Sequence, residues 1–272
     1  MMRIKRRKDN FFKITETPGQ KASREQLSRI YSRYHFAKQY ASGKDVLDVG
    51  CGSGIGLSYL AETARSVVGI DIDEKNIKMA QDLASGNTKV KVALSDAHCL
   101  GFKNDSFDMV LLFEAIYYLD RPELFLKEAH RILREGGILM ISSVNKDWRD
   151  FHPSIYARKY FSTKELYLLL SDWFSFVELY GDFPADYEGG RDRFVSFLKR
   201  LASKMHIIPG SLTAREKLKR LFFGELSEIP KELSCGMADY AEPVKLEQNQ
   251  VTNGYKIIYA VARKSCGKDY GL

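Results

Sequence analysis

Hydrophobic and polar positions follow two alternating rhythms from about Lys44 onward. Short runs rich in β-branched residues predict strands, and the longer amphipathic segments between them predict helices. Strands that alternate with helices form a parallel sheet covered on both faces, and right-handed crossovers make this sheet doubly wound. The sequence therefore predicts an α/β fold, with strands at residues 45–50, 66–72, 89–96, 107–113 and 138–144 and helices at 53–64, 73–84 and 121–137.

The pattern loosens on both sides of this stretch. A helix is expected before the first strand, at residues 23–41, and a helix and a strand after the last one, at 163–174 and 175–181. A further strand is expected near the end of the chain, at residues 253–264. Together these strands predict a seven-stranded, mostly parallel, Rossmann-like sheet.

The span between the last two predicted strands is long for a connection. Residues 182–252 include helical patterns around 193–204 and 214–222, which favours a cap or lid over a plain loop. We therefore expect four parts: a basic N-terminal arm and helix (1–43), a Rossmann-like core (44–181), a helical cap insert (182–252) and a terminal strand that completes the core sheet (253–272).

The net charge of +7 is concentrated in two segments. Residues 1–43 hold eleven Lys and Arg against three Asp and Glu, and residues 191–220 hold nine against two. The rest of the chain is acidic, with 22 basic residues against 30 acidic ones. Two basic segments beside an acidic centre suggest an anionic partner, and the competing interpretation is a solvated tail and a solvated helix face.

The cysteines and histidines argue against metal and disulfide frameworks. The four cysteines form no C-x-x-C pair and no ligand spacing with the five histidines, so no metal site is expected. No apolar run reaches the roughly 20 residues of a transmembrane segment, and the basic N-terminus lacks the apolar part of a secretory signal. We expect a cytoplasmic protein, and the sequence leaves its oligomeric state open.

The stretch from Asp45 to Gly56 reads DVLDVGCGSGIG, with a glycine at every second position from Gly50 onward. It lies at the turn between the first predicted strand and the next helix, where doubly wound sheets bind ligands. A dinucleotide fingerprint is excluded because Ile55 stands where G-x-G-x-x-G needs its third glycine, and no Gly-Lys-Ser/Thr follows to make a P-loop. We expect a ligand that presses against bare backbone at this turn.

The same stretch resembles the D-x-G-x-G-x-G motif of class I S-adenosylmethionine-dependent methyltransferases of the small-molecule type. The resemblance covers about residues 45–145 and implies a methyltransferase with S-adenosyl-L-methionine as its cofactor. Three later segments resemble the family's further motifs in the same order, namely VVGIDIDEKNI (67–77), LSDAHCLGFKNDSFDMVLLFEAIYYL (94–119) and ILREGGILMISSV (132–144).

The resemblance also implies a cofactor site. The glycines would contact the methionine portion, whose carboxylate a helix N-terminus favours. Asp71 would accept hydrogen bonds from both ribose hydroxyls, and Asp96 with the Ala97 N–H would bind the adenine. The plainer alternatives are a polar strand end for Asp71, a helix N-cap for Asp96, a core residue for Phe113 and a buried filler for Cys51. The full expected set is Asp48, Gly50, Cys51, Gly52, Gly54, Asp71, Ile72, Asp96, Ala97 and Phe113.

Methyl transfer needs a base only where the acceptor must first lose a proton. Many small-molecule relatives carry Glu-x-x-x-His after the fourth strand, and Tyr118 stands here at the histidine position. His35 and His152 are alternative bases, so the catalytic candidates are His35, Tyr118 and His152. The aromatic residues expected either around the acceptor or in the core are Tyr31, Tyr34, Tyr117, Tyr118 and Trp148.

Three functions are compatible with these patterns. The leading one is a methyltransferase that acts on an oxygen or nitrogen of a small-molecule acceptor, with an anionic, sugar- or nucleotide-linked metabolite favoured by the basic insert. The second is an RNA methyltransferase whose arm and insert contact phosphates, which the acidic core and the lack of a known RNA-binding module disfavour. The third is a non-catalytic subunit that binds the cofactor, or a membrane surface through its basic N-terminus.

Overall fold

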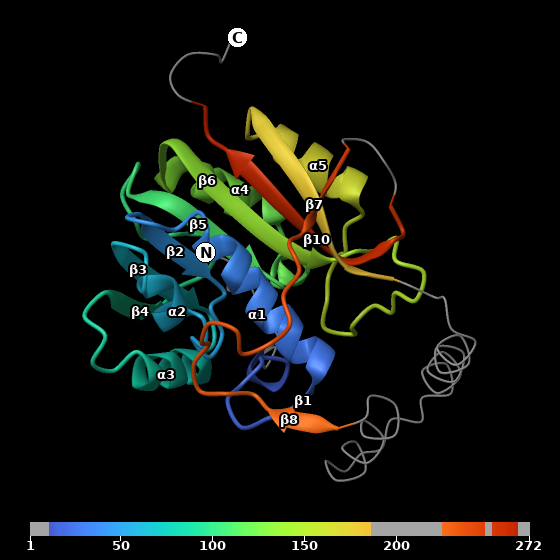
Figure 1. Cartoon of the computed structure of the whole chain (residues 1–272). Coiled ribbons are helices and arrows are strands. Elements are labelled where there is room, and N and C mark those ends of the chain that lie inside the picture. Colours follow the sequence, from blue (N-terminus) through green and yellow to red (C-terminus); the bar gives the residue numbers. More distant parts are fainter. Residues whose placement is uncertain (1–10, 186–224, 248–251, 266–272) are drawn as a thin grey trace, which may run out of the picture.

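The structure is a computed structural model, and it describes residues 11–185, 225–247 and 252–265. Its centre is an eight-stranded sheet with the strand order β4-β3-β2-β5-β6-β10-β7-β9 (Figure 1). Neighbours from β4 to β6 pair in parallel, whereas β10 runs antiparallel to both β6 and β7. The strands are β2 (Asp45–Val49), β3 (Ser66–Asp71), β4 (Val90–Leu94), β5 (Phe107–Phe113), β6 (Leu133–Val144), β7 (Phe176–Pro184), β9 (Val244–Leu246) and β10 (Tyr255–Arg263).

This arrangement confirms the predicted α/β class and the mostly parallel sheet. The strand count differs by one, because the short β9 joins the edge of the sheet beside β7. A separate two-stranded sheet pairs β1 (Lys21–Ser23) with β8 (Leu226–Glu228).

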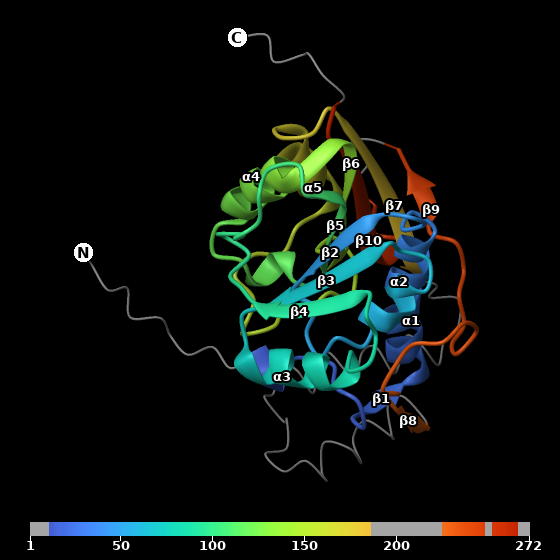
Figure 2. The same ribbon diagram turned by 90° about the vertical axis from the view of Figure 1, so that its left-hand side faces the viewer.

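Helices cover both faces of the sheet. One face packs against α1 and α2, with Ala80 of α3, and the other packs against α4 and α5 (Figure 2). Neighbouring residues of a strand enter opposite layers, as Val46 and Leu47 of β2 do, because successive side chains point to opposite faces. The helices are η1 (Phe11–Lys13), α1 (Arg24–Lys38), α2 (Leu57–Ala61), α3 (Glu74–Leu83), η2 (Ile116–Tyr118), α4 (Pro122–Ile132) and α5 (Thr163–Ser171).

Side chains in the sequence determine where the helices begin. Ser23 caps α1, since its side chain accepts the Gln26 N–H while the Gln26 side chain accepts the Ser23 N–H, and α5 begins with the same arrangement. Asp73 caps α3 as predicted, with its carboxylate accepting the Lys75 N–H at 2.9 Å. Each such cap stabilises its helix by about 1 kcal/mol.

Two predicted boundaries are wrong. The helix predicted for 53–64 covers only Leu57–Ala61, because the glycine turn continues with left-handed backbone at Gly54. The helix predicted for 121–137 ends at Ile132, and β6 begins at Leu133 instead of residue 138. Leu133 is fully buried and pairs with β5, so tertiary packing ends the helix before the first glycine that could stop it.

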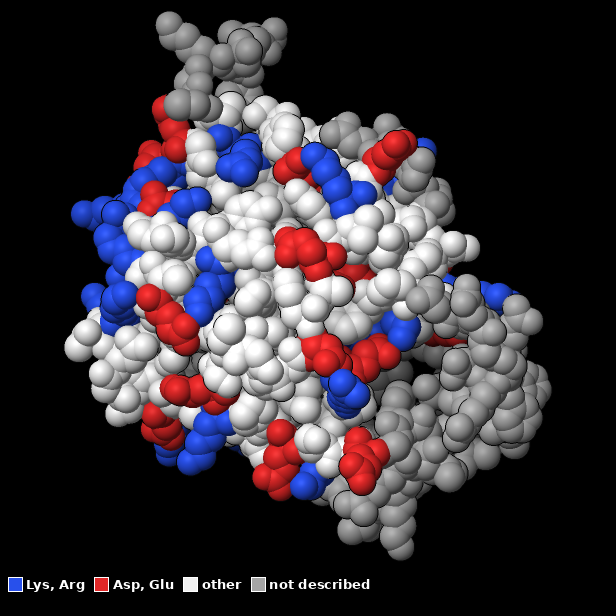
Figure 3. All heavy atoms as spheres, in the orientation of Figure 1, with Lys and Arg blue, Asp and Glu red and all other residues white. Residues whose placement is uncertain are grey.

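The described part of the predicted basic arm carries its own acidic partners. All five Lys and Arg residues between 21 and 38 form an ion pair with a carboxylate. On the face of the molecule that Figure 3 shows, acidic and basic side chains lie interspersed. The pairs are Lys21–Glu228, Arg24–Asp239, Arg29–Glu25, Arg33–Glu16 and Lys38–Glu62. The charges of α1 are thus largely neutralised within the fold.

The predicted cap at 182–252 falls mostly on residues outside the described part of the chain, which are 186–224 and 248–251. The described remainder packs on the core. β9 pairs with β7 of the central sheet, β8 pairs with β1 before α1, and the Gly236 N–H donates to the Tyr31 hydroxyl on α1 at 2.9 Å. The cap itself stays a prediction. In the described residues, no helix combines the length and the apolar character needed to cross a membrane.

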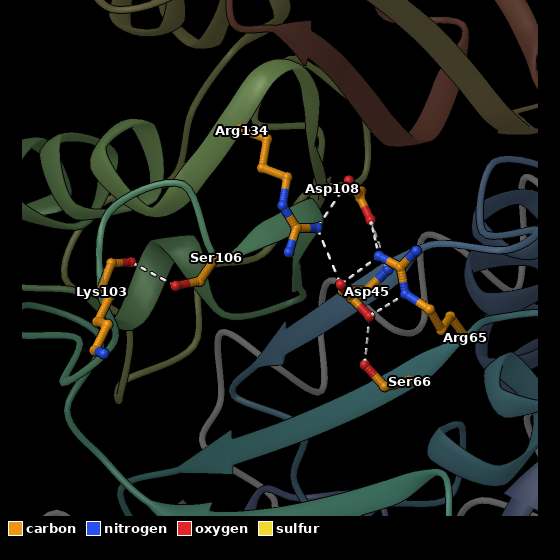
Figure 4. Close-up of polar contacts among 7 residues, drawn as sticks. All are labelled: Asp45, Arg65, Ser66, Lys103, Ser106, Asp108 and Arg134. Atoms are coloured by element: carbon orange, nitrogen blue, oxygen red, sulfur yellow. Dashed lines mark hydrogen bonds and ion pairs between the residues drawn. The ribbon is translucent and has the colours of Figure 1, made fainter.

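An ion-pair network joins the strands at their amino ends (Figure 4). Asp45 at the start of β2 accepts from Arg65 at 2.9 Å, from Arg134 at 3.0 Å and from the Ser66 hydroxyl at 2.8 Å. Both guanidinium groups also contact Asp108 of β5, at 3.1 and 2.9 Å. Hydrogen bonds from Arg65 hold the pKa of Asp45 well below its usual range. The network stabilises the end of the sheet opposite the carboxyl ends of the strands.

Candidate active site

A cavity of about 970 Å³ opens at the carboxyl ends of β2, β3, β4 and β5. The chain leaves β2 for β3 on one side of the sheet and later returns to β5 on the other side, so β2 lies at the topological switch point. Doubly wound sheets bind their ligands in the crevice at such a point. The cavity is also of the size that small-molecule sites have.

The glycine turn forms one wall of the cavity. Gly50, Cys51 and Gly52 line it, but Gly54 does not. A Cβ on Gly54 would lie 2.7 Å from the Ala80 Cβ of α3, and Gly54 has a φ of +79°. This glycine is therefore required by left-handed backbone and by contact with a neighbouring helix, and the expectation that a ligand requires it needs correction.

The helix that follows the glycine turn also differs from the prediction. A methionine carboxylate was expected to meet a helix N-terminus directly after the glycines. The helix α2 begins only at Leu57 and has five residues, so it offers a weak dipole at some distance from Gly52. Backbone groups of the turn itself remain as the polar partners on this wall.

Asp71, at the end of β3, lies beside the turn and lines the cavity. Its Oδ2 accepts the Gly52 N–H at 3.0 Å, and its Oδ1 accepts the Asp73 N–H at 2.8 Å and the Asn76 amide at 3.3 Å. Burial raises its pKa, and these hydrogen bonds oppose the rise. A carboxylate has about four acceptor positions, so Asp71 has room for one further donor, or two if the long Asn76 bond yields.

The remaining predicted nucleoside contacts lie along the same edge. Ile72, Asp96, Ala97 and Phe113 all line the cavity. Asp96 already accepts the backbone N–H of His98 at 3.0 Å and lies 2.7 Å from its ring Nδ1. Burial raises the pKa of the Cys51 thiol well above its usual value, as expected of an inert filler.

Asp48 is fully buried and does not line the cavity. It accepts a hydrogen bond from the Tyr34 hydroxyl at 2.9 Å, and burial raises its pKa to about 7. The Tyr34 ring lies over Gly56, where an added Cβ would be 2.2 Å from the ring. Asp48 thus supports the glycine turn by holding α1 against it, and its predicted contact with the cofactor gains no support from this cavity.

A segment that sequence reasoning missed covers the turn. Phe11, Ile14, Thr15 and Glu16 line the cavity, and three hydrogen bonds attach this segment to the core. The Phe12 N–H donates to Asp73 at 3.1 Å, Asn76 donates to the Thr15 hydroxyl at 3.0 Å, and the Ser53 hydroxyl donates to the Glu16 carbonyl at 2.8 Å. No hydrophobic period marks these residues, so the sequence gives no signal for their position.

The wall beyond the turn combines aromatic and charged groups. Tyr34 packs edge-on to Phe113, with ring centres 5.3 Å apart, and Tyr118 packs edge-on to both Tyr117 and Phe11. The buried Arg33 of α1 also lines this wall, paired with Glu16. Burial alone would lower the pKa of Arg33, but the charge and hydrogen bond of Glu16, together with Tyr34 and Glu114, raise it above its usual value and keep the guanidinium protonated.

Glu114 follows the last residue of β5 on the same wall. Its backbone has a φ of +50°, which non-glycine residues rarely adopt and which often occurs at functional sites. The Tyr117 hydroxyl donates to its Oε2 at 2.9 Å. Glu114 is the first residue of the Glu-x-x-x-His pattern noted in the sequence, and that pattern is the signal by which it could have been selected.

Of the three predicted catalytic residues, only Tyr118 lines the cavity. His35 does not line the cavity, since its Nδ1 lies 3.0 Å from the Tyr31 hydroxyl and 2.7 Å from that of Tyr59. His152 is exposed and also lies outside the cavity lining. This cavity therefore gives neither prediction of a histidine base any support.

Tyr118 does line the cavity. Burial raises its pKa to about 12, so its hydroxyl is protonated at neutral pH and cannot act as a base there. Of the other aromatic candidates, Tyr34 and Tyr117 line the cavity, whereas Tyr31 and Trp148 do not. Among the residues with described positions, no group of three His, Cys, Asp or Glu side chains could hold a metal ion.

Comparison with known proteins identifies the family of the central residues. Residues 47–141 match the family model described as "Methyltransferase domain". The chain is 31% identical over 134 residues to a ubiquinone biosynthesis O-methyltransferase of Pelagibacter ubique. The aligned residues make up 49% of this chain and 55% of that protein. It is 37% identical over 105 residues to a 2-methyl-6-phytyl-1,4-hydroquinone methyltransferase of Synechocystis, covering 38% and 33% of the two chains. The chain thus spans about half the length of the curated relatives it matches.

Solved structures support the same fold over most of the chain. A SAM-dependent methyltransferase of Thermotoga maritima, described as a possible histamine N-methyltransferase, aligns with a TM-score of 0.55 at 19% identity, covering 89% of this chain and 92% of that one. The YcgJ protein of Bacillus aligns with a TM-score of 0.53 at 16% identity, covering 86% and 98%. At these identities the likeness concerns the fold alone.

Proposed function

We propose that this chain, whose residues 47–141 match a methyltransferase domain, is a class I enzyme that transfers a methyl group from S-adenosyl-L-methionine to a hydroxyl oxygen of a small aromatic molecule. The observation that supports this most directly is the cavity at the switch point, which joins two differently built ends. One end has the glycine turn and the Asp71 carboxylate, and the other has aromatic side chains around Glu114. The first suits the cofactor and the second suits an acceptor.

The residues of the first end fit S-adenosyl-L-methionine. Asp71 has capacity left for a ribose hydroxyl, Ile72 and Phe113 offer apolar surface to a flat base, and Asp96 offers a carboxylate to an exocyclic amine. When bound, the cofactor supplies a methyl group on a positively charged sulfur, which needs no further activation. The task of the protein is then to align the acceptor and to exclude water.

The second end favours a neutral, flat acceptor. Aromatic side chains supply large apolar area and stack on rings. The described lining of the whole cavity holds five carboxylates against three guanidinium groups, which gives no excess positive charge for an anion. Relatives named for methylation in ubiquinone and hydroquinone pathways act on aromatic or quinol molecules by their names, which supports the same class here.

The anionic, sugar- or nucleotide-linked acceptor favoured by the sequence depends on the basic residues 191–220. These lie outside the described residues, so that preference stays a prediction. An RNA acceptor is less well supported, because the described Lys and Arg of α1 are already paired with carboxylates. A subunit that binds the cofactor without turnover is the remaining alternative, and an activity assay separates it.

The test is transfer of labelled methyl from S-adenosyl-L-methionine to a panel of catechols and hydroxybenzoates, with tRNA and sugar nucleotides as competing acceptor classes. We expect label on the aromatic hydroxyl and loss of transfer in Asp71→Ala. Transfer to RNA or to a sugar nucleotide alone would contradict the acceptor class. Cofactor binding without transfer to any acceptor class would favour the non-catalytic alternative.

A further inference from the structure

Methylation of a hydroxyl oxygen leaves one proton to be removed, and none of the histidines that the structure describes lies at the acceptor end of the cavity. The oxygen lone pair forms the new O–C bond while the C–S bond breaks with its electron pair going to sulfur, so the hydroxyl proton must pass to a base. Apart from tyrosines, the arginines and the inert Cys51 thiol, the titratable groups of the described cavity wall are Glu16, Asp71, Asp96, His98, Glu114 and Asp120.

Most of these groups are paired with another side chain or lie where the nucleoside is expected. Asp71, Asp96 and His98 lie at the ends of β3 and β4, where the nucleoside is expected. Glu16 is paired with the buried Arg33 guanidinium. Asp120 is exposed and lies 2.7 Å from the Arg158 guanidinium. Elimination therefore leaves Glu114.

The carboxylate of Glu114 has one well-bonded oxygen and one nearly unengaged oxygen. Oε2 accepts the Tyr117 hydroxyl at 2.9 Å, whereas Oε1 has, within the described part of the chain, only a long 3.5 Å contact from the Ser142 hydroxyl. The backbone is fixed as well, since the Glu114 N–H donates to the Ser142 carbonyl at 3.0 Å despite the positive φ. The next residue, Ala115, lies beside Gly50, 3.2 Å from where a Cβ on that glycine would be. Glu114 is thus held next to the turn with an acceptor atom to spare.

The charges around Glu114 suit a base. Burial raises its pKa, while Arg33 and the Tyr117 hydrogen bond lower it and the charge of Glu16 raises it again. Burial also keeps the pKa of Tyr117 well above its usual value, so Tyr117 stays a donor.

We propose that Glu114 is the general base, taking the proton of the acceptor hydroxyl on Oε1, and that Tyr117 is the residue that positions it. The inference rests on the proposed function. The proton passes from the acceptor oxygen to Oε1 and leaves for water after the methylated product has gone. Tyr117 contributes by holding Oε2, which fixes the direction of Oε1.

The first test reads the carboxylate itself. The protein is labelled with ¹³C at the glutamate carboxyl carbons, loaded with S-adenosylhomocysteine and titrated by NMR, and Glu114→Gln identifies the Glu114 signal. We expect this signal to titrate above the usual glutamate pKa of about 4.3. Tyr117→Phe should raise that pKa further, because the ionised form loses a hydrogen bond. A Glu114 signal that stays protonated up to pH 9, or that ignores Tyr117→Phe, would overturn the proposal.

The second test uses catechol, whose hydroxyls stay protonated at neutral pH, as the methyl acceptor. General-base catalysis contributes roughly 10²–10⁴-fold, so Glu114→Gln should lower kcat by that factor, with KM nearly unchanged and the acidic limb of the pH profile lost. Glu123→Gln, an exposed glutamate of α4 outside the cavity lining, is the matched control and should behave as wild type. If the wild type methylates the acceptor and Glu114→Gln does so equally fast, the assignment of Glu114 as the base is refuted and the proposed function is not. A wild type that binds S-adenosylhomocysteine but methylates no phenol would refute the proposed acceptor class and the base together.

Discussion

Gly54→Ala tests why the glycine turn needs its last glycine. Gly54 has a φ of +79°, and an added Cβ would lie 2.7 Å from the Ala80 Cβ and 2.9 Å from the Ala80 Cα. Left-handed backbone costs a non-glycine residue about 1–2 kcal/mol. Overpacking adds about 1–3 kcal/mol, and here the contact is with helix backbone, which cannot rotate away. Gly54→Ala should therefore lower the free energy of unfolding by about 2–5 kcal/mol.

Gly43→Ala is the matched control for this experiment. Gly43 has a φ of +68°, but nothing lies within 4 Å of where its Cβ would be, so only the backbone cost of about 1–2 kcal/mol applies. Urea unfolding followed by circular dichroism gives both free energies of unfolding and their difference. A difference of about 1–3 kcal/mol would confirm the contact with α3. If both variants lose the same stability within about 0.5 kcal/mol, the argument that α3 requires Gly54 is wrong.

Two further predictions concern stability against pH. The folded pKa of Asp45 lies below the unfolded value of about 3.9. Its ion-pair network therefore stabilises the fold by about 1 kcal/mol above that pH, and this stabilisation is lost as the pH falls. Asp45→Asn should thus lower stability at pH 7 and flatten the decline that begins as pH falls below about 4, and parallel curves in thermal unfolding would count against it. Asp48 has the opposite sign, because its folded pKa of about 7 makes the fold lose stability as pH rises from about 4 to 7. Asp48→Asn should remove most of that loss in urea unfolding at pH 5 and 8, and an unchanged loss would refute the buried-acid interpretation.

The core of the fold could be predicted because its signals are local. Runs of β-branched residues indicate the strands, and the glycine spacing indicates the first turn. The position of Asp71 follows from the end of a predicted strand. Helix ends were less accurate, since Leu133 leaves its helix to pair with β5, and pairing with a distant strand leaves no local signal.

Three aromatic candidates for the acceptor end, Tyr34, Tyr117 and Tyr118, do line the cavity, but the segment that covers the glycine turn could not be predicted, because it binds a distant part of the chain. The contact between Thr15 and Asn76 joins residues 61 positions apart. The cavity gives the His35 prediction no support, for a geometric reason. Arg33 lines the cavity, but two residues further along α1 the side chain of His35 points to another side and meets Tyr59 instead. Which face of a helix meets a cavity depends on packing that one sequence does not record.

The central claim is that the cavity binds a sulfur-containing nucleoside through Asp71, and calorimetric titration with S-adenosylhomocysteine tests it most directly. We expect one molecule bound by the wild type and at least roughly tenfold weaker binding by Asp71→Ala, since a hydrogen bond to a charged group contributes about 1.5–3 kcal/mol. Asp45→Asn, a carboxylate change at the opposite end of the sheet, should bind as wild type. A folded wild type that produces no heat of binding, or an Asp71→Ala variant that binds equally well, would contradict the account.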